Sequence, residues 1–119
     1  MSARFVILHH TGFGNEHWDL MLEQGEILLT WRLEVDPTIR SNFPMGATRI
    51  GDHRKAYLDY EGPLSGGRGS VRRLDRGGLE WVATSPDRYE FHANGTVLKG
   101  LWVLETQSGN WVLRAGETS

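Results

Sequence analysis

The hydrophobic positions of this chain come in runs of four to eight residues, separated by glycine-rich breaks. This spacing is typical of a β-sandwich or β-barrel rather than of a helical protein. The run 17–23 alternates strictly, so an extended segment presents two different faces. One face carries Trp18, Leu20 and Leu22, and the other carries His17, Asp19, Met21 and Glu23. Gln24-Gly25 then predicts a turn, after which 26–33 returns as a second strand.

Further strands are predicted wherever apolar runs recur. They lie at 5–8, 70–74, 79–83, 88–92, 97–104 and 110–113, and Asn94-Gly95 and Ser108-Gly109 are favourable hairpin turns. Segment 36–46 predicts a loop with at most one helical turn, 52–60 is ambiguous, 62–69 is a glycine-rich connection, and 116–119 is a loose tail. We therefore expect residues 1–119 to form one all-β domain, a small antiparallel β-barrel with minor helical turns.

Composition narrows the classes of function. The 119 residues suit one domain with a modest core, and the absence of cysteine excludes disulfides and thiolate metal sites. No signal peptide and no apolar stretch of about 18 residues is visible, so we expect a cytoplasmic protein without membrane contact. The formal net charge is −2. General nucleic-acid binders are usually basic, so any nucleic-acid contact must be local.

The polar face of the 17–23 strand suggests a metal site. His17 and Asp19 lie on one face about 6.5–7 Å apart at Cα, and His10, just past the first strand, can supply a third ligand. Two imidazoles and one carboxylate suit Mn²⁺, Zn²⁺ or Fe²⁺ and leave positions open for water or substrate. His9 is an alternative ligand, because strand alternation lets only one of the two histidines face the site. Without the third ligand, a His-x-Asp pair is more often a solvated strand surface.

A second polar cluster spans 52–57. His53 is able to protonate a leaving oxygen or to hold a phosphate oxygen, and the Tyr57 hydroxyl is able to donate a hydrogen bond to the same anion. On local evidence alone, a capped, solvated loop with a buried tyrosine is the favoured interpretation of these residues. A third group is basic and consists of Arg68, Arg72, Arg73 and Arg76. Strand alternation allows at most half of it to form one patch, which would follow a nucleic-acid backbone or protect a sheet edge.

The order of these motifs resembles the 3′-phosphoesterase domain family of bacterial DNA ligase D. The resemblance rests first on Phe5-Val-Ile-Leu-His-His10, His17-Trp-Asp-Leu-Met-Leu-Glu23 and Leu28-Leu-Thr-Trp31. It continues through Asp52-His53, Tyr57, Tyr60-Glu61-Gly62, Gly69-Ser-Val71, Asp75-Arg-Gly77 and Leu98-Lys-Gly-Leu-Trp102. It therefore spans nearly the whole chain.

The resemblance implies a β-barrel hydrolase of DNA repair that uses Mn²⁺, with Zn²⁺ or another divalent ion as alternatives. Its reaction would remove a 3′-ribonucleotide or 3′-phosphate from a nucleic-acid end. The metal ligands would be His10, His17 and Asp19, since counting from the first strand selects His10 over His9. His53 and Tyr57 would bind phosphate or act as the acid. The partners implied are a nucleic-acid 3′ end or a phosphorylated small substrate, with a separate ligase or polymerase as a candidate.

The chain departs from the family pattern at several points. The family has an arginine that holds the scissile phosphate two residues after the metal aspartate, where this chain has Met21, and an acidic residue where this chain has Gly51. Only four residues precede Phe5, where the family carries a charged arm, and the loop from His10 to His17 is one residue longer.

Because of these departures, other arginines must be considered for phosphate binding, and other functions must be considered for the chain. We expect Arg49, Arg54 or Arg68 to contact the phosphate or the nucleic acid in place of the missing side chain. The runner-up hypothesis is a non-catalytic or altered-specificity relative that binds metal and a phosphorylated or nucleic-acid end. A third is a β-barrel interaction module without metal.

Overall fold

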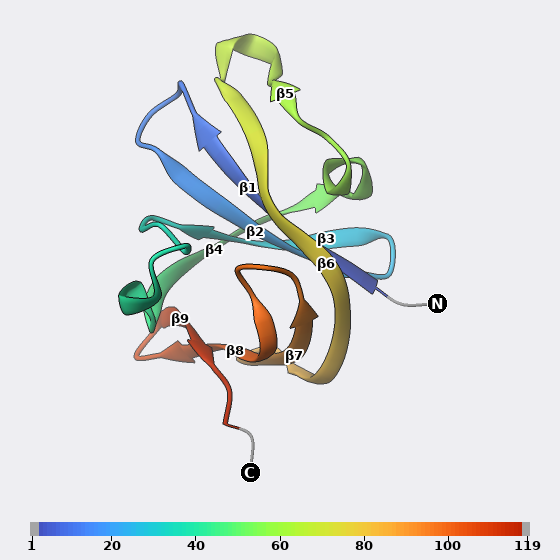
Figure 1. The fold of residues 1–119 in the computed structure, drawn as a ribbon, viewed down its shortest axis with the longest axis vertical. Coiled ribbons are helices and arrows are strands. Elements are labelled where there is room, and N and C mark those ends of the chain that lie inside the picture. The colour runs from blue at the N-terminus through green and yellow to red at the C-terminus, as the bar shows by residue number, and fades with distance from the viewer. Residues whose placement is uncertain (1–2, 118–119) are drawn as a thin grey trace.

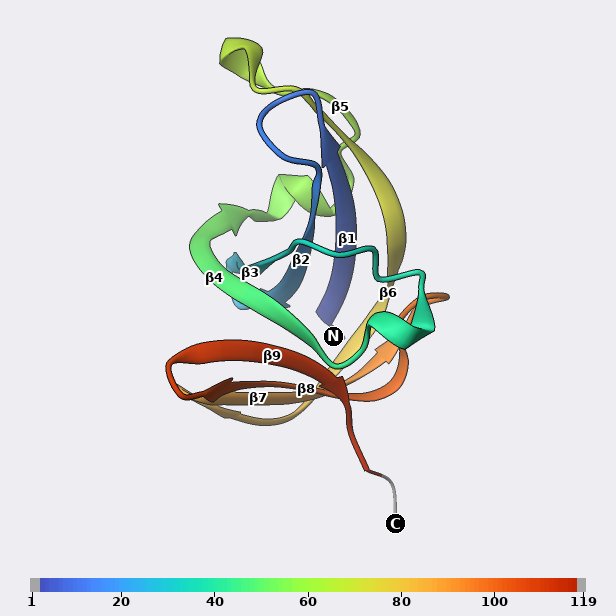
Figure 2. The same cartoon turned by 90° about the vertical axis from the view of Figure 1, so that its left-hand side faces the viewer.

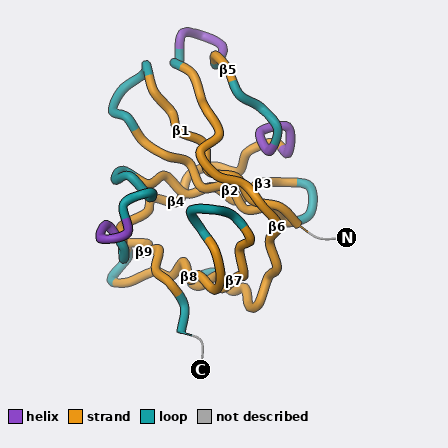
Figure 3. The backbone as a smooth tube through the Cα atoms, in the orientation of Figure 1, coloured by secondary structure: helices purple, strands orange, loops and turns teal. Residues whose placement is uncertain are grey.

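The computed structural model describes residues 3–117, and most of them lie in strands or tight turns. Within that range the nine strands are β1 (Ala3–Thr11), β2 (His17–Gln24), β3 (Ile27–Leu33), β4 (Met45–Arg54), β5 (Gly62–Pro63), β6 (Ser70–Ser85), β7 (Arg88–Asn94), β8 (Lys99–Gln107) and β9 (Asn110–Ala115). Three single 3-10 turns are η1 (Arg40–Asn42), η2 (Lys55–Leu58) and η3 (Ser65–Gly67), drawn purple in Figure 3. No helix in 3–117 is long and apolar enough to cross a membrane.

Antiparallel pairing closes the sheet into a barrel. Hydrogen-bonded neighbours run in the order β1-β2-β3-β4-β9-β8-β7-β6, and β6 pairs again with β1, so that the ring is complete (Figure 1). The short β5 pairs with the start of β6 outside this ring. The predicted all-β antiparallel barrel with minor helical turns is therefore confirmed. Figure 2 shows that β7, β8 and β9 form the end of the barrel that lies away from the β1–β2 loop.

Two hairpins follow from their turn residues. Between β2 and β3 the register pairs Gln24 with Ile27, and Gly25 has a φ of 62°, which suits the first position of a type II′ turn. Between β8 and β9 the turn residues Ser108 and Gly109 both have positive φ, at 52° and 85°. That is the backbone of a type I′ turn, whose twist matches that of the flanking strands. The turn at Ser108-Gly109 was predicted from the sequence, whereas the turn predicted at Gln24-Gly25 lies one residue later, at 25–26.

The prediction of separate strands at 70–74 and 79–83 was wrong, because β6 is continuous from Ser70 to Ser85. Its middle contains Gly77, where an added Cβ would lie 2.1 Å from the carbonyl oxygen of Asn94, so the glycine permits close passage of two backbones. The Asp75 carboxylate accepts hydrogen bonds from the backbone N–H groups of Thr96, Val97 and Leu98. This holds 95–98 as a turn, so β8 begins at Lys99 rather than at residue 97.

The prediction also missed β4. The segment 36–46 was expected to be a loop and 52–60 was ambiguous, whereas the strand runs from Met45 to Arg54. Among the described residues of β4, only Met45 is buried, so this strand lacks the alternation of apolar and polar residues that marks the other strands. In the 116–119 tail, Gly116 donates a hydrogen bond to the carbonyl of Leu101 at 2.8 Å, and residues 118–119 lie outside the described residues.

Buried side chains form two clusters on opposite faces of the β1–β3 sheet. The larger one fills the barrel and includes Phe5, Ile7, Trp18, Leu20, Leu22, Leu29, Trp31, Leu33, Phe91, Leu104 and Leu113. The smaller one lies outside the barrel and comprises Val6, Leu8, Met21, Leu28, Leu58 and Val71. Strand β1 contributes to both, which explains its uninterrupted apolar run. The segment 55–64 covers the smaller cluster and so creates a second, concave face beside β2.

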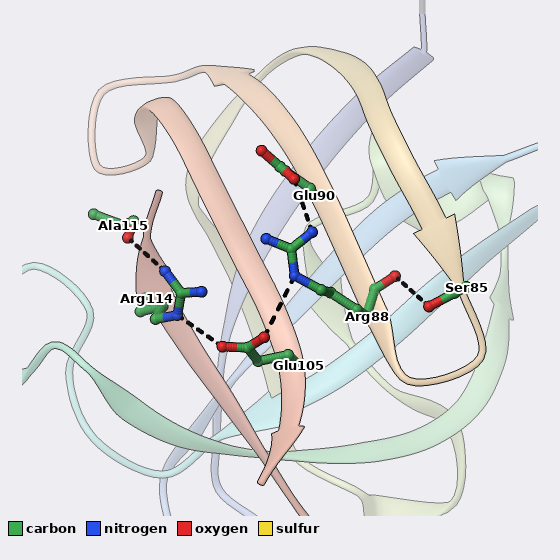
Figure 4. A network of polar contacts seen from close by, with 6 residues as sticks. All are labelled: Ser85, Arg88, Glu90, Glu105, Arg114 and Ala115. Atoms are coloured by element: carbon green, nitrogen blue, oxygen red, sulfur yellow. Dashed lines mark hydrogen bonds and ion pairs between the residues drawn. The ribbon is translucent and has the colours of Figure 1, made fainter. Parts of the chain in front are cut away.

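An ion-pair network stabilises the far end of the barrel across three strands (Figure 4). Glu105 on β8 accepts a hydrogen bond from Nε of Arg114 at 2.9 Å and lies 3.4 Å from Nε of Arg88. Arg88 in turn contacts Glu90 at 2.8 Å. These strands carry none of the residues with candidate chemistry, so the network acts on the scaffold alone.

Candidate active site

The polar face of β2 forms the floor of a pocket of about 340 Å³ outside the barrel core. Strands β1 and β3 extend this floor, while the 13–15 loop, β4 and the 57–68 segment supply the walls. The alternation of β2 explains the arrangement, because Trp18, Leu20 and Leu22 enter the barrel and leave the intervening side chains facing outward. The pocket therefore collects the polar residues of three neighbouring strands.

Strand register brings the three predicted metal ligands together. His10 on β1 is paired directly with His17 on β2, and Asp19 follows on the same face of β2. Their ligand atoms all lie within 4.8 Å of one another. Nδ1 of His10 is 3.0 Å from Nε2 of His17, which is 3.6 Å from Oδ2 of Asp19. His17 and Asp19 are buried and His10 is partly buried.

The outer nitrogens of both imidazoles are held by backbone carbonyls. Nε2 of His10 lies 2.7 Å from the carbonyl oxygen of Arg68, and Nδ1 of His17 lies 2.9 Å from that of Asn15. A carbonyl oxygen only accepts, so these two nitrogens donate. In the neutral rings the remaining nitrogens then carry lone pairs, and these lone pairs face each other across 3.0 Å. Such an arrangement is unfavourable unless a proton or a cation lies between them.

Asp19 contributes an oxygen that the protein leaves without a partner. Its Oδ1 atom is buried and receives no hydrogen bond from any described residue. A buried acceptor left in this state costs about 1–3 kcal/mol. Burial raises the pKa of Asp19, and the neighbouring His17, Arg32, His53 and His10 oppose that rise.

These donors fit a divalent cation. Two nitrogens bound at right angles, each about 2.1 Å from one ion, are about 3.0 Å apart, which is the separation of the facing His10 and His17 nitrogens. Two imidazoles and a carboxylate suit Mn²⁺, Zn²⁺ or Fe²⁺. Holding the second N–H of each imidazole on a carbonyl is also how metal-binding histidines are commonly oriented. The orphaned Asp19 oxygen would gain a partner from the same ion.

His9 lies on the opposite face from this cluster. Its ring stacks on Trp18 with centroids 4.9 Å apart, and its Nε2 is 2.6 Å from Oε2 of Glu16. The choice that sequence alternation left open between His9 and His10 is thus decided geometrically, because only His10 reaches His17 and Asp19.

The second predicted cluster lines the same pocket. His53 on β4 donates from Nδ1 to the carbonyl of Gly51 at 2.9 Å, which leaves Nε2 available. Its ring meets that of Tyr57 edge to face, with centroids 5.4 Å apart. Tyr57 comes from η2 and packs against the smaller apolar cluster. The structure therefore brings His53 and Tyr57 to the predicted metal ligands from a different part of the chain.

The predicted arginines are distributed unequally. Arg68 lines the pocket, although its guanidinium donates to the carbonyl and hydroxyl of Ser65. Arg54 lines a neighbouring pocket of about 310 Å³, which Arg68 shares. Arg49 lies elsewhere, with its guanidinium 4.6 Å from the ring centroid of Trp31.

Arg73 is the member of the predicted basic group that is tied to an acid. Its backbone N–H donates to Oε2 of Glu61 at 2.8 Å, and its guanidinium lies 3.8 Å from Oε1 of the same carboxylate. Arg72 and Arg76 are exposed on β6 and do not line the pocket. The four predicted basic residues therefore do not form one continuous basic surface with the pocket.

Two charged residues of the pocket, Arg32 and Glu34, were not singled out from the sequence. Arg32 on β3 is paired directly with Asp19 on β2 and lines the pocket. The predicted turn at Gln24-Gly25 would pair Asp19 with Thr30, whereas the observed turn at 25–26 pairs Asp19 with Arg32. Met21, the next residue on the floor after Asp19, is buried in the smaller apolar cluster and offers no charge.

Comparison with known proteins gives the family. No curated protein matches the chain. A family model described as the DNA ligase D 3′-phosphoesterase domain matches residues 8–106. This range covers most of the barrel and every residue that lines the pocket. The chain therefore belongs to the DNA ligase D 3′-phosphoesterase domain family.

Proposed function

We propose that this domain is a divalent-metal-dependent phosphoesterase that removes a 3′-phosphate or a 3′-ribonucleotide from nucleic-acid ends. The proposal rests on the nitrogen and oxygen lone pairs in the pocket that have no partner among the described residues and can bind a metal ion. Two imidazole lone pairs and a buried carboxylate oxygen converge there, beside a histidine whose Nε2 is available. Family membership supplies the reaction class, and the donor set supports the metal requirement.

The pocket residues have separate roles in the proposed hydrolysis. His10, His17 and Asp19 would hold Mn²⁺, which supplies Lewis acidity toward phosphoryl oxygens and lowers the pKa of water. His53, oriented by the Gly51 carbonyl, would in its imidazolium form donate the Nε2 proton to the departing oxygen as water adds to phosphorus and the phosphorus–oxygen bond breaks. The departing oxygen is the 3′ oxygen of the primer for a 3′-phosphate and the 5′ oxygen of the released nucleoside for a 3′-ribonucleotide. The Tyr57 hydroxyl donates a hydrogen bond to a non-bridging phosphate oxygen.

An aromatic side chain at the pocket favours a nucleotide over a small phosphorylated metabolite. Phe13 in the β1–β2 loop is 54% exposed although it lines the pocket. An exposed aromatic ring beside a phosphate site offers a platform on which a base can stack, worth about 1–3 kcal/mol per base. Local stacking of this kind agrees with a chain whose net charge is −2.

The test is incubation of the purified protein with Mn²⁺ and a primer–template that ends in a 3′-ribonucleotide or a 3′-phosphate. We expect release of nucleoside or inorganic phosphate, loss of this release with chelator, and its absence in Asp19→Ala. Asp87→Ala, at an exposed turn, serves as the control. Binding of Mn²⁺ and of the primer without turnover would instead identify a binding relative. Absence of both metal binding and turnover would leave the interaction module.

A further inference from the structure

We propose that Arg32 is the phosphate-binding arginine of this pocket, reaching the substrate from β3 rather than from β2. This inference rests on the proposed function, because it assigns a residue to the phosphate that such an enzyme must hold. Three observations carry it, namely the position of Arg32 opposite a predicted metal ligand, its lack of a partner, and the charge balance of the pocket.

The position of Arg32 is fixed by hydrogen-bonded strand pairing. Arg32 and Asp19 are directly opposite residues of the β2–β3 hairpin and therefore share one face. The neighbours of Arg32 along β3, Trp31 and Leu33, are buried in the barrel core, so the guanidinium is on the pocket side. The side chain thus stands beside the predicted metal ligands on a rigid element rather than on a loop.

The Arg32 guanidinium has an N–H group without a hydrogen-bond acceptor among the described residues. This group is on Nε, which is buried. No carboxylate in residues 3–117 lies within ion-pair distance of its guanidinium, although Asp19 and Glu34 line the same pocket. Arg68, by contrast, already donates to Ser65. A guanidinium presents five N–H donors in a planar fork that matches the oxygens of a phosphate, so an oxyanion would satisfy the orphaned donor.

The charge balance also favours an anion at this point. With a divalent cation on His10, His17 and Asp19, the adjacent Arg32 would add a further positive charge to a partly enclosed site. The carboxylates of Asp19 and Glu34 offset part of this positive charge, and the remainder attracts an anion. A phosphate placed there would be stabilised by both the cation and Arg32, as in other enzymes that preorganise positive groups around a transferring phosphoryl group.

The test compares Arg32→Met with Arg32→Lys and with Arg40→Met, a control at an exposed arginine on η1 that lines no part of the pocket. Binding is measured by calorimetry with inorganic phosphate, adenosine 3′-monophosphate and a 3′-phosphorylated primer. Mn²⁺ affinity is measured separately by electron paramagnetic resonance. Should Arg32→Met lack the native circular dichroism spectrum, Arg32→Gln replaces it as the neutral variant.

We expect Arg32→Met to weaken inorganic phosphate binding at least tenfold and to lower kcat/KM for phosphate release by about 10²–10³, with Mn²⁺ affinity unchanged. Arg32→Lys should retain part of the native phosphate affinity, and Arg40→Met should retain all of it. A larger loss for the primer than for the mononucleotide would locate the phosphate at a nucleic-acid end.

Three results would overturn the inference, the first two of which concern phosphate binding and the last Mn²⁺ binding. The first is native phosphate affinity in Arg32→Met, and the second is no phosphate binding by the native protein. The third is a loss of Mn²⁺ affinity as large as that of Asp19→Ala, since Arg32 would then only position the carboxylate. A native protein that binds phosphate through Arg32 but releases none from the primer would refute the proposed function and leave this inference standing.

Discussion

The Nδ1 atom of His10 lies 3.0 Å from the Nε2 atom of His17, and in the neutral rings neither nitrogen carries a hydrogen. His10→Gln should therefore weaken Mn²⁺ binding on the order of 100-fold or more, because it removes one of two imidazole donors. His9→Gln is the matched control, since its ring lies on the other face against Trp18. Titration of Mn²⁺ followed by electron paramagnetic resonance measures both. Equal losses in the two variants would contradict the assignment.

Asp19→Asn should have opposite effects with and without metal. Burial raises the pKa of Asp19, so at neutral pH the ionised carboxylate opposes folding when no cation is bound. We expect the metal-free variant to melt at the same temperature as the native protein or higher. The native protein alone should gain stability from Mn²⁺, about 2.7 kcal/mol at one hundred times the Kd. Thermal melts of both proteins with and without Mn²⁺, beside Asp87→Asn, provide the measurement. A lower melting temperature for metal-free Asp19→Asn would show that the carboxylate is stabilising.

His53→Gln should lower the rate of phosphate release by about 10²–10⁴ while leaving Mn²⁺ affinity intact, because the role proposed for His53 is to donate a proton and not to bind the ion. His92→Gln, at an exposed position of β7, is the control. Initial rates on a 3′-phosphorylated primer at saturating Mn²⁺ separate kcat from KM. An unchanged kcat in His53→Gln would exclude the residue as the acid.

Glu105→Gln should make the stability of the barrel less dependent on pH. The hydrogen bond from Arg114 lowers the pKa of Glu105 below its ordinary 4.5, against an opposing effect of burial. A lowered pKa in the folded state means that the carboxylate stabilises the protein above pH 4.5 and that this contribution disappears as the pH falls through the folded pKa.

Urea denaturation at pH 7 should therefore show Glu105→Gln less stable than the native protein by about 0.5–1 kcal/mol, since partly exposed ion pairs contribute no more. The two proteins should converge under acidic conditions. Glu80→Gln, on the exposed side of β6, should match the native protein at both pH values. A constant difference at all pH values would show that the effect of Glu105 is not ionic.

The sequence predicts those parts of the fold and site in which one face is apolar. The strict alternation around Trp18 and Leu20 identifies the central hairpin and, with it, the face that bears His17 and Asp19. Strand β4 escapes notice because Met45 is its one buried residue within the described range, so no periodic signal marks it. The continuity of β6 is hidden by Gly77, whose missing side chain indicates a break in the sequence but serves close backbone contact in the sheet.

The finer chemistry of the site depends on contacts between distant segments. The assignment of lone pairs requires the carbonyls of Asn15 and Arg68 to meet the imidazoles, and these carbonyls belong to loops whose path no local pattern specifies. The position of Arg32 depends on the exact turn, because the observed turn at 25–26 places it opposite Asp19, whereas the predicted turn at Gln24-Gly25 would place Thr30 there. A shift of one residue in the turn moves every cross-strand partner by two residues, so the sequence did not identify Arg32.

The spacing of His10 and His17 is set by cross-strand pairing, not by the length of chain that joins them. Residues 12–14 at the tip of the intervening loop can therefore change, provided that the Asn15 carbonyl still reaches Nδ1 of His17, since loop length has only a weak thermodynamic effect. That loop also carries Phe13, the exposed aromatic side chain at the pocket. The side chain at position 13 can thus change without moving the two strands that carry the proposed metal ligands.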